Sequence, residues 1–351
     1  YKGGGIYSSN GSSLFSENSN ISNNEANGDG SGIFADNTYL SIKNSQIISN
    51  FTEHHLGGGL YNSGCSGILE NTHILNNSAS QGGGVYLAGG SLDFVDVLVS
   101  GNNGDSGGGI RVLGNCSSSF INTVILKNIS NYGGGGGIYL QTNSGSQPIT
   151  FENVTIAENI SNGNWFGGGG ICMLSSDNYQ LNNMTIIGNV AYRGGAICLA
   201  SGAKPTISNT TIIDNIGLES SSQIVNHDCC NTFPEPIINN NNIISTGYGL
   251  YNSQNSIFLD ATNNYWGDSS GPYHPTQNSS GQGDSVNAYV NVDPWLTAPN
   301  TDAPPIPAQN TTVTGTGNDF ISLDWDASLI GDLAGYKLYY DSDSNGYPYA
   351  N

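Results

Sequence analysis

Residues that could bind a ligand stand just before a series of glycine runs in this 351-residue sequence. They are Glu53, His54, His55, Tyr132, Trp165, Phe166, Tyr192 and Arg193. Exposed aromatic rings stack on the apolar faces of sugars, and nearby carboxylate, amide and guanidinium groups hydrogen-bond to sugar hydroxyls. The set therefore predicts a glycan-binding stripe. The alternative is that these side chains are solvated loop tips whose rings cover the edge of the fold.

Two stretches carry residue types that ligate metal ions. Residues 53–55 read Glu-His-His, but adjacent loop residues rarely bind one ion without a third ligand from elsewhere. The string DSDSNG at 341–346 places Asp341, Asp343 and Asn345 at alternate positions, as in the first half of a calcium-binding loop. A polar hairpin turn is the alternative for that string. The sequence requires no cofactor, and Ca²⁺ is the one ion that it suggests.

The six cysteines allow a disulfide, but the absence of any C-x-x-C pair argues against zinc. Cys172 and Cys198 occupy equivalent places after consecutive glycine runs. Stacked repeats would place their Cα atoms about 4.8 Å apart, within reach of a disulfide. A stacked pair of thiols is the alternative, and a cysteine of NHDCCN at 226–231 could pair with Cys198 instead. An even number of cysteines fits an oxidising, extracellular setting.

Two repeated motifs predict the elements that position these residues. In the first, an aliphatic residue follows a glycine run or stands at the equivalent position, and successive copies are 27, 27, 25, 25, 28, 33, 26, 27 and 26 residues apart. These residues are Ile6, Ile33, Leu60, Val85, Ile110, Ile138, Ile171, Ile197, Ile224 and Leu250. In the second, asparagines flank a β-branched residue at a distance of three, as in NSQIISN at 44–50 and NTTIIDN at 209–215.

A fixed period of this length indicates stacked repeats. The apolar stretches are four to six residues long, alternate in polarity and are separated by Gly, Asn and Ser, which is typical of strands. The sequence therefore predicts a parallel β-helix of about ten coils, in which each strand pairs with its equivalent in the next coil. Glycine suits the turns because it has no Cβ to collide with its stacked copy. The closing asparagines are predicted to form an internal ladder.

The tetrapeptide GGAI at 194–197 and the recurring I-x-x-N resemble the repeats of chlamydial polymorphic outer-membrane proteins. More broadly, they resemble right-handed parallel β-helix repeat proteins of bacterial surfaces, over about residues 1–296. The resemblance implies an all-β, right-handed parallel β-helix that is extracellular or on the cell surface, in a Gram-negative bacterium. It says less about function, because this fold carries both enzymes and adhesins.

The repeat rhythm ends before the C-terminal part of the chain. The predicted domains are β-helix repeats at 1–262, a C-terminal cap at 263–296, a Pro-rich linker at 297–307 and a further domain at 308–351. Trp266 falls where the central isoleucine of the second motif would stand. The alternation around Trp325 and the following GYKLYY resemble the first strands of a fibronectin type III domain, of which about half is present. We expect a longer multidomain chain.

The charge of the chain excludes some partners. Seven Lys and Arg residues stand against 27 Asp and Glu, a net charge of −20, so phosphate backbones and anionic lipid surfaces would be repelled. No apolar run reaches the roughly 20 residues of a membrane span. We therefore expect glycans or other surface proteins as partners, no nucleic acid and no membrane insertion.

A catalytic centre is harder to assemble from these residues. A lyase of the pectate-lyase type needs calcium-binding carboxylates on one sheet and an arginine or lysine to take up the proton. A glycosidase needs two facing carboxylates. Arg193 with Glu158 or Asp214 is the best remaining set. The sequence thus predicts a non-catalytic module for adhesion, glycan contact or envelope structure. The alternative is a polysaccharide lyase or glycoside hydrolase of that β-helix class.

Overall fold

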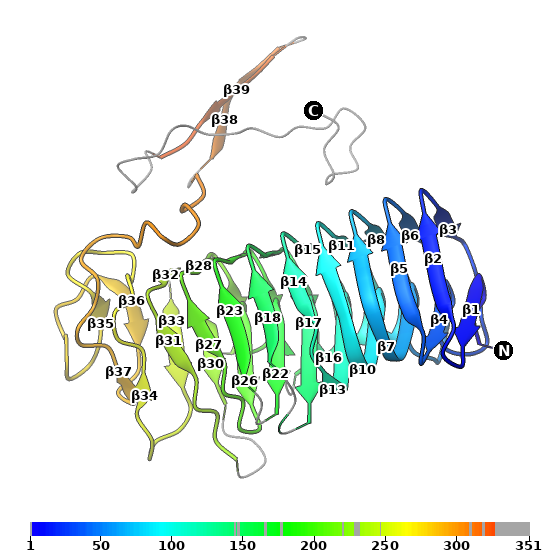
Figure 1. Ribbon diagram of the computed structural model, residues 1–351. Coiled ribbons are helices and arrows are strands. Elements are labelled where there is room, and N and C mark those ends of the chain that lie inside the picture. Colours follow the sequence, from blue (N-terminus) through cyan, green and yellow to red (C-terminus); the bar gives the residue numbers. More distant parts are fainter. Residues whose placement is uncertain are drawn as a thin grey trace. The chain divides into compact units, whose positions relative to one another are not determined.

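The computed structural model describes residues 2–143, 145, 148–164, 167–175, 178–219, 221–227, 232–245, 247–308, 311–317 and 320–326. Within these ranges the chain consists of β-strands, turns and irregular segments, without a helix. It forms two compact units, Tyr1–Pro304 and Pro305–Asn351. The first unit is a parallel β-solenoid of about ten coils, whose strands lie side by side along the rod (Figure 1).

Strands at equivalent places in successive coils form four columns. The first column consists of β1 (Ile6–Ser9), β4 (Ile33–Asp36), β7 (Leu60–Glu70), β10 (Val85–Val95), β13 (Ile110–Cys116), β17 (Ile138–Thr142), β22 (Ile171–Leu174), β26 (Ile197–Ala200), β30 (Ser222–Asn226), β33 (Tyr248–Asn252) and β36 (Gly283–Val286). The second consists of β2 (Ser13–Glu17), β5 (Tyr39–Lys43), β14 (Ser119–Ile121), β18 (Ile149–Glu152), β23 (Tyr179–Asn182), β27 (Thr206–Ser208) and β31 (Ile237–Asn239). The long strands β7 and β10 run through both columns and join them into one sheet.

The third column carries the second motif and the fourth precedes the glycine runs. The third consists of β3 (Asn20–Ser22), β6 (Gln46–Ile48), β8 (His73–Leu75), β11 (Leu98–Ser100), β15 (Val124–Leu126), β19 (Thr155–Ala157), β24 (Thr185–Ile187), β28 (Thr211–Ile213) and β32 (Asn242–Ile244). The fourth consists of β9 (Ser78–Gln81), β12 (Asn103–Ser106), β16 (Ile129–Gly135), β20 (Ile160–Ser161), β25 (Val190–Ala191) and β29 (Ile216–Gly217). A short strand, β21 (Gly167–Gly168), also pairs with β16.

The strand register confirms the predicted stacking of the repeats. Ile110 pairs with Ile138, and Ile138 pairs with Ile171. The same line of pairs runs through the whole aliphatic set from Ile6 to Leu250. The central residues of the second motif pair in the same way from Ile21 to Ile243. Residues one period apart are therefore direct neighbours, while the right-handed winding stays a prediction.

The core of the solenoid is a continuous stack of apolar side chains inside these columns. Phe94, Phe120 and Phe151 come from successive coils and stack with ring centroids 4.6 and 4.8 Å apart. All three are at most 1% exposed, as are most inward-facing isoleucines. Burying one such side chain contributes roughly 1.5–3 kcal/mol. Each coil therefore depends on the coils on both of its sides.

An internal ladder of asparagines closes the turn after the third column. Asn128 Nδ2 donates to Asn159 Oδ1 in the next coil at 2.9 Å and to the Val99 carbonyl at 3.0 Å. Asn128 Oδ1 accepts from the backbone N and the Nδ2 of Asn102, both at 3.0 Å. The pattern continues through the asparagines from Asn24 to Asn215. These bonds satisfy buried polar groups of the turn, which confirms the predicted ladder.

The glycine runs follow from the close approach of neighbouring coils. A Cβ atom on Gly59 would lie 2.6 Å from the carbonyl oxygen of Gly84 in the next coil. Gly57, at the start of the same run, has a φ of 67°, which side chains with a Cβ disfavour. The repeat therefore needs glycine both for the backbone conformation and for the stacking distance.

The chain departs from the repeat after β33. The strand β36 pairs with β33, and the short strands β34 (Leu259–Asp260), β35 (Pro272–Tyr273) and β37 (Val290–Asn291) pair within the same region. Tyr265 bridges to Asn242, which places Trp266 opposite Ile243, as the sequence predicts. Trp266 is completely buried.

Residues of the Pro-rich segment lie on the third column. The backbone N of Asn300 donates to Asn242 Oδ1 at 2.7 Å, and Thr211 Oγ1 donates to the Pro304 carbonyl. The first part of the predicted linker is therefore bound to the solenoid. In the second unit, β38 (Thr312–Thr316) and β39 (Ile321–Asp324) form an antiparallel pair.

Candidate functional site

Tyr132 of the predicted stripe lines a pocket together with residues that precede two other glycine runs. Gln81, Asp105 and Tyr132 precede the glycine runs of three consecutive coils, and together they line a pocket of about 280 Å³. Ser106 and Tyr139 also line this pocket. The pocket thus combines a carboxylate, an amide, hydroxyl groups and two aromatic rings. These are the groups with which proteins contact sugars.

Tyr132 is presented by an irregularity in the fourth column. Between Ser130 and Gly133, β16 has one residue more than β12 has between Gly104 and Ser106, so the register shifts. A bulge of this kind turns a side chain away from the regular ladder. The Tyr132 side chain is 78% exposed. Its ring is therefore open to a ligand.

Arg111 and Tyr139 form a fixed pair beside this pocket. The Arg111 guanidinium carbon lies 4.2 Å from the centroid of the Tyr139 ring. Arg111 Nη1 donates to Ser106 Oγ at 2.6 Å, and Nη2 donates to Gln141 Oε1 at 3.2 Å. Burial raises the pKa of Tyr139 to about 12. A tyrosine hydroxyl is protonated at neutral pH even without this shift, so Tyr139 can donate a hydrogen bond.

A second pocket, of about 330 Å³, lies further along the stripe. It is lined by Arg193, Glu219, Val225, His227, Tyr251 and Ser253. Arg193 Nε lies 2.9 Å from Glu219 Oε2, and Arg193 Nη1 contacts His227 Nε2. The carbonyl of Tyr192 accepts a hydrogen bond from the Glu219 backbone. Of the predicted Tyr192–Arg193 pair, Arg193 lines this pocket.

The predicted Glu-His-His triplet does not converge on one point. His55 Nδ1 lies 3.9 Å from Asp29 Oδ1, whereas His54 Nε2 lies 3.6 Å from the largely exposed carboxylate of Glu53. Across the described part of the chain, no three His, Cys, Asp or Glu side chains gather as metal ligands. The predicted residues that lie outside the described residues are Trp165, Phe166, Asp341, Asp343 and Asn345.

Cys172 and Cys198 are paired in register on β22 and β26 and are completely buried. They carry thiols, so the structure contains the stacked pair rather than the disulfide. Residues in register on adjacent parallel strands have parallel Cα–Cβ bonds, which keeps their Cβ atoms about 4.8 Å apart. A disulfide needs a Cβ separation of about 3.5–4.5 Å. The Cα spacing alone was therefore an insufficient criterion.

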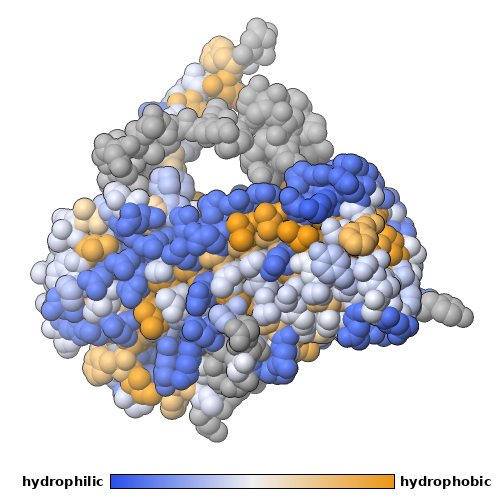
Figure 2. Space-filling view, viewed as in Figure 1, coloured by the Kyte–Doolittle hydropathy of each residue, from blue (hydrophilic) through white to orange (hydrophobic). Residues whose placement is uncertain are grey.

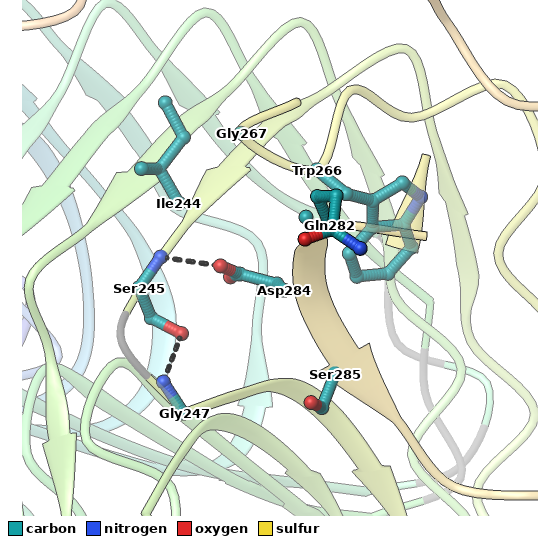
Figure 3. A pocket seen from close by; sticks show the side chains of 9 residues that line it. Ile244, Ser245, Gly247, Trp266, Gly267, Gln282, Asp284 and Ser285 are labelled. Carbon is teal, nitrogen blue, oxygen red and sulfur yellow. Dashed lines mark hydrogen bonds between the residues drawn. The ribbon is translucent and has the colours of Figure 1, made fainter. Parts of the chain in front are cut away.

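A third pocket surrounds a buried carboxyl that the sequence did not indicate (Figure 3). Its volume is about 310 Å³, and Trp266, Gln282 and Ser285 are among its lining residues. Asp284 Oδ1 accepts a hydrogen bond from the Ser245 backbone at 2.8 Å (Figure 3). Burial raises the pKa of Asp284 to about 8. The carboxyl is therefore mostly protonated at neutral pH.

The Asp284 pocket adjoins a fourth pocket, which contains another carboxyl. Asp214 lines this neighbour, which has a volume of about 340 Å³, and Ser245 and Gly247 line both. Burial raises the pKa of Asp214, and its charge contributes to the raised pKa of Asp284. Asp214 was a sequence candidate only as a catalytic partner of Arg193. Asp284 lies in the irregular segment after β33, where the repeat gives no register from which to place it.

Neither the surface of the molecule nor its similarity to known proteins indicates a function. The face seen in Figure 2 is hydrophilic over much of its area, with limited apolar patches. No described helix is long and apolar enough to cross a membrane. No protein-family model, no curated protein and no solved structure matches the chain. The function is therefore inferred from the pockets themselves.

Proposed function

We propose that this chain is a secreted or cell-surface module that binds glycans without cleaving them, in adhesion or in envelope structure. The observation that supports this most directly is the pocket of Gln81, Asp105 and Tyr132, with its exposed ring beside polar groups. A sugar ring stacks on Tyr132, while the Asp105 carboxylate and the Gln81 amide bind its hydroxyl groups.

The second pocket extends the same binding surface. Arg193 precedes a glycine run two coils beyond the run that Tyr132 precedes, a distance of about 10 Å along the rod. The rod holds both loops in fixed positions, so little ordering is needed when a long ligand binds. A glycan chain of several sugars therefore contacts both pockets, and longer oligosaccharides should bind more tightly than short ones.

A glycan panel with the purified chain tests this proposal. Tyr132→Ala should weaken binding roughly tenfold, because it removes the ring on which the sugar stacks. Phe15→Ala is the matched control, since Phe15 is 71% exposed on β2 and lies outside the pocket. Equal affinity of the wild type and Tyr132→Ala for every bound glycan would contradict the proposed site.

Hydrolysis of a glycosidic bond is the second candidate function. It is favoured by Asp284, a protonated acid, which faces a pocket adjoining that of Asp214. In such a reaction Asp284 gives its proton to the leaving oxygen, and the Asp214 carboxylate takes a proton from the water that attacks the anomeric carbon. Release of new reducing ends from a polysaccharide, abolished in Asp284→Asn and in Asp214→Asn, would support it. A bound glycan that is recovered intact would exclude it for that glycan.

The C-terminal part supports a role as one module in a longer surface protein. We propose that residues 263–296 cap the last coil, because β36 pairs with β33 and Trp266 continues the core stack. A fibronectin-like spacer follows, which the antiparallel pair β38–β39 fits. Deleting residues 263–304 should lower the melting temperature strongly, and deleting 305–351 should not. Calorimetry with Ca²⁺ tests the predicted ion site at 341–345.

A further inference from the structure

Each lysine and arginine among the described residues already has a partner. Five of them pair with carboxylates at 2.6–3.7 Å: Lys2 with Asp29, Lys43 with Glu70, Lys127 with Glu158, Arg193 with Glu219 and Lys204 with Glu235. The sixth, Arg111, donates to Ser106 and Gln141 and lies against the ring of Tyr139. A ligand carboxylate that approached one of the five paired cations would also approach the carboxylate that already contacts it.

The two pockets of the stripe are lined by two carboxylates, Asp105 and Glu219, and by one arginine, Arg193. The pocket of Tyr132 contains the Asp105 carboxylate, and in the second pocket Glu219 balances the charge of Arg193. The whole chain carries a net charge of −20. An anionic polymer is therefore repelled both by the local pocket and by the long-range field of the protein.

We propose that the stripe recognises uncharged glycan chains and rejects glycans that carry carboxylate or sulfate groups. This inference rests on the proposed function, since it names the class of glycan for the same two pockets. An uncharged sugar needs hydrogen-bond acceptors for its hydroxyl groups and a ring for its apolar face, and the pocket of Gln81, Asp105 and Tyr132 supplies both. A uronic acid would bring its own charge towards Asp105, while the nearby Arg111 is already held by Ser106, Gln141 and the ring of Tyr139.

A matched pair of ligands tests the inference. Galacturonan oligosaccharides of equal length are prepared fully methyl-esterified, and therefore neutral, or de-esterified, and therefore anionic. Binding at neutral pH is measured by calorimetry, beside neutral glucan, galactan, mannan, xylan and chitin oligosaccharides. We expect every glycan that binds to be neutral, and the ester to bind at least about tenfold more tightly than its acid at low salt. High salt should narrow the difference.

Two variants separate the local carboxylate from the overall charge. Asp105→Asn should reduce the preference for the ester over the acid several-fold. Asp260→Asn makes the same change of charge at an exposed position on β34 and should leave that preference within about twofold.

The outcomes distinguish this inference from the function on which it rests. Tyr132-dependent binding of the acid as tight as, or tighter than, that of the ester would overturn the uncharged class and leave glycan binding in place. Binding of neither neutral nor acidic chains would overturn both.

Discussion

Replacing the buried carboxyl in Asp284→Asn should make the protein less sensitive to rising pH. In the unfolded chain this carboxyl ionises near pH 4, whereas burial raises its pKa to about 8 in the folded protein. Between these values the folded state holds one proton more than the unfolded state. The free energy of unfolding of the wild type therefore falls as the pH rises through this window. Below the window both states are protonated, and above it both are ionised.

The size of the effect follows from the two pKa values. A difference of about four units corresponds to roughly 5 kcal/mol as an upper limit, or about 1.4 kcal/mol for each pH unit. The amide keeps an oxygen that can accept the hydrogen bond from the Ser245 backbone. Asp284→Asn should therefore gain stability over the wild type steadily between about pH 4 and pH 8.

Urea unfolding followed by circular dichroism measures this difference at several pH values across the window. Asp260→Asn serves as the control, because it removes an exposed carboxylate from β34 and changes the net charge equally. A difference between the wild type and Asp284→Asn that stays constant across the window would refute the reasoning. The folded carboxyl would then titrate like that of the unfolded chain, despite its burial.

Other features of the solenoid give three further predictions. Asn128→Ala should lower the free energy of unfolding in urea by about 3–4 kcal/mol, because it deletes four buried side-chain hydrogen bonds. Its control, Asn71→Gly, lies at an exposed position with a φ of 44° and should lower that free energy by less than about 1 kcal/mol. Gly59→Ala should lower the melting temperature by several degrees more than Gly114→Ala. A Cβ at position 59 meets a backbone oxygen at 2.6 Å, whereas one at 114 meets nothing within 4 Å and is disfavoured only by the φ of 79° there. Burial raises the pKa of Cys116 to about 11, so stability should fall between about pH 9 and pH 11, and Cys116→Ala should lose that part of the fall.

The sequence predicted the solenoid because each of its two motifs recurs about once in every coil. The motifs predicted that Ile110 pairs with Ile138 and Ile138 with Ile171, although these two coils differ in length. The extra residues lie outside the paired strands and leave the register unchanged. The asparagine ladder was readable for the same reason. Trp266 could be placed opposite Ile243 because the second motif continues into that segment for one more copy.

The pockets could be predicted only in part. The spacing placed Tyr132 and Arg193 on one stripe. It did not show that they line two separate pockets, or that Tyr139 and Tyr251, which do not precede a glycine run, line these pockets with them. Insertions of a few residues in the loops decide these contacts, and the repeat does not encode them. Asp284 was missed because its position depends on how an irregular segment folds back against Ser245.

The repeat and the candidate sites carry different information. A position that recurs in each coil is constrained by its stacked neighbours, so the Ile, Gly and Asn residues at such positions are required for packing. The proposed binding pocket lies beside two places where the repetition breaks. Arg111 interrupts the outer aromatic column of Phe34, Tyr61 and Tyr86, and Tyr132 sits in the bulge of β16 beside it. A ligand in this pocket therefore contacts side chains that stacking does not require. Substitutions there should change binding while leaving the solenoid intact, and substitutions in the ladder should do the reverse.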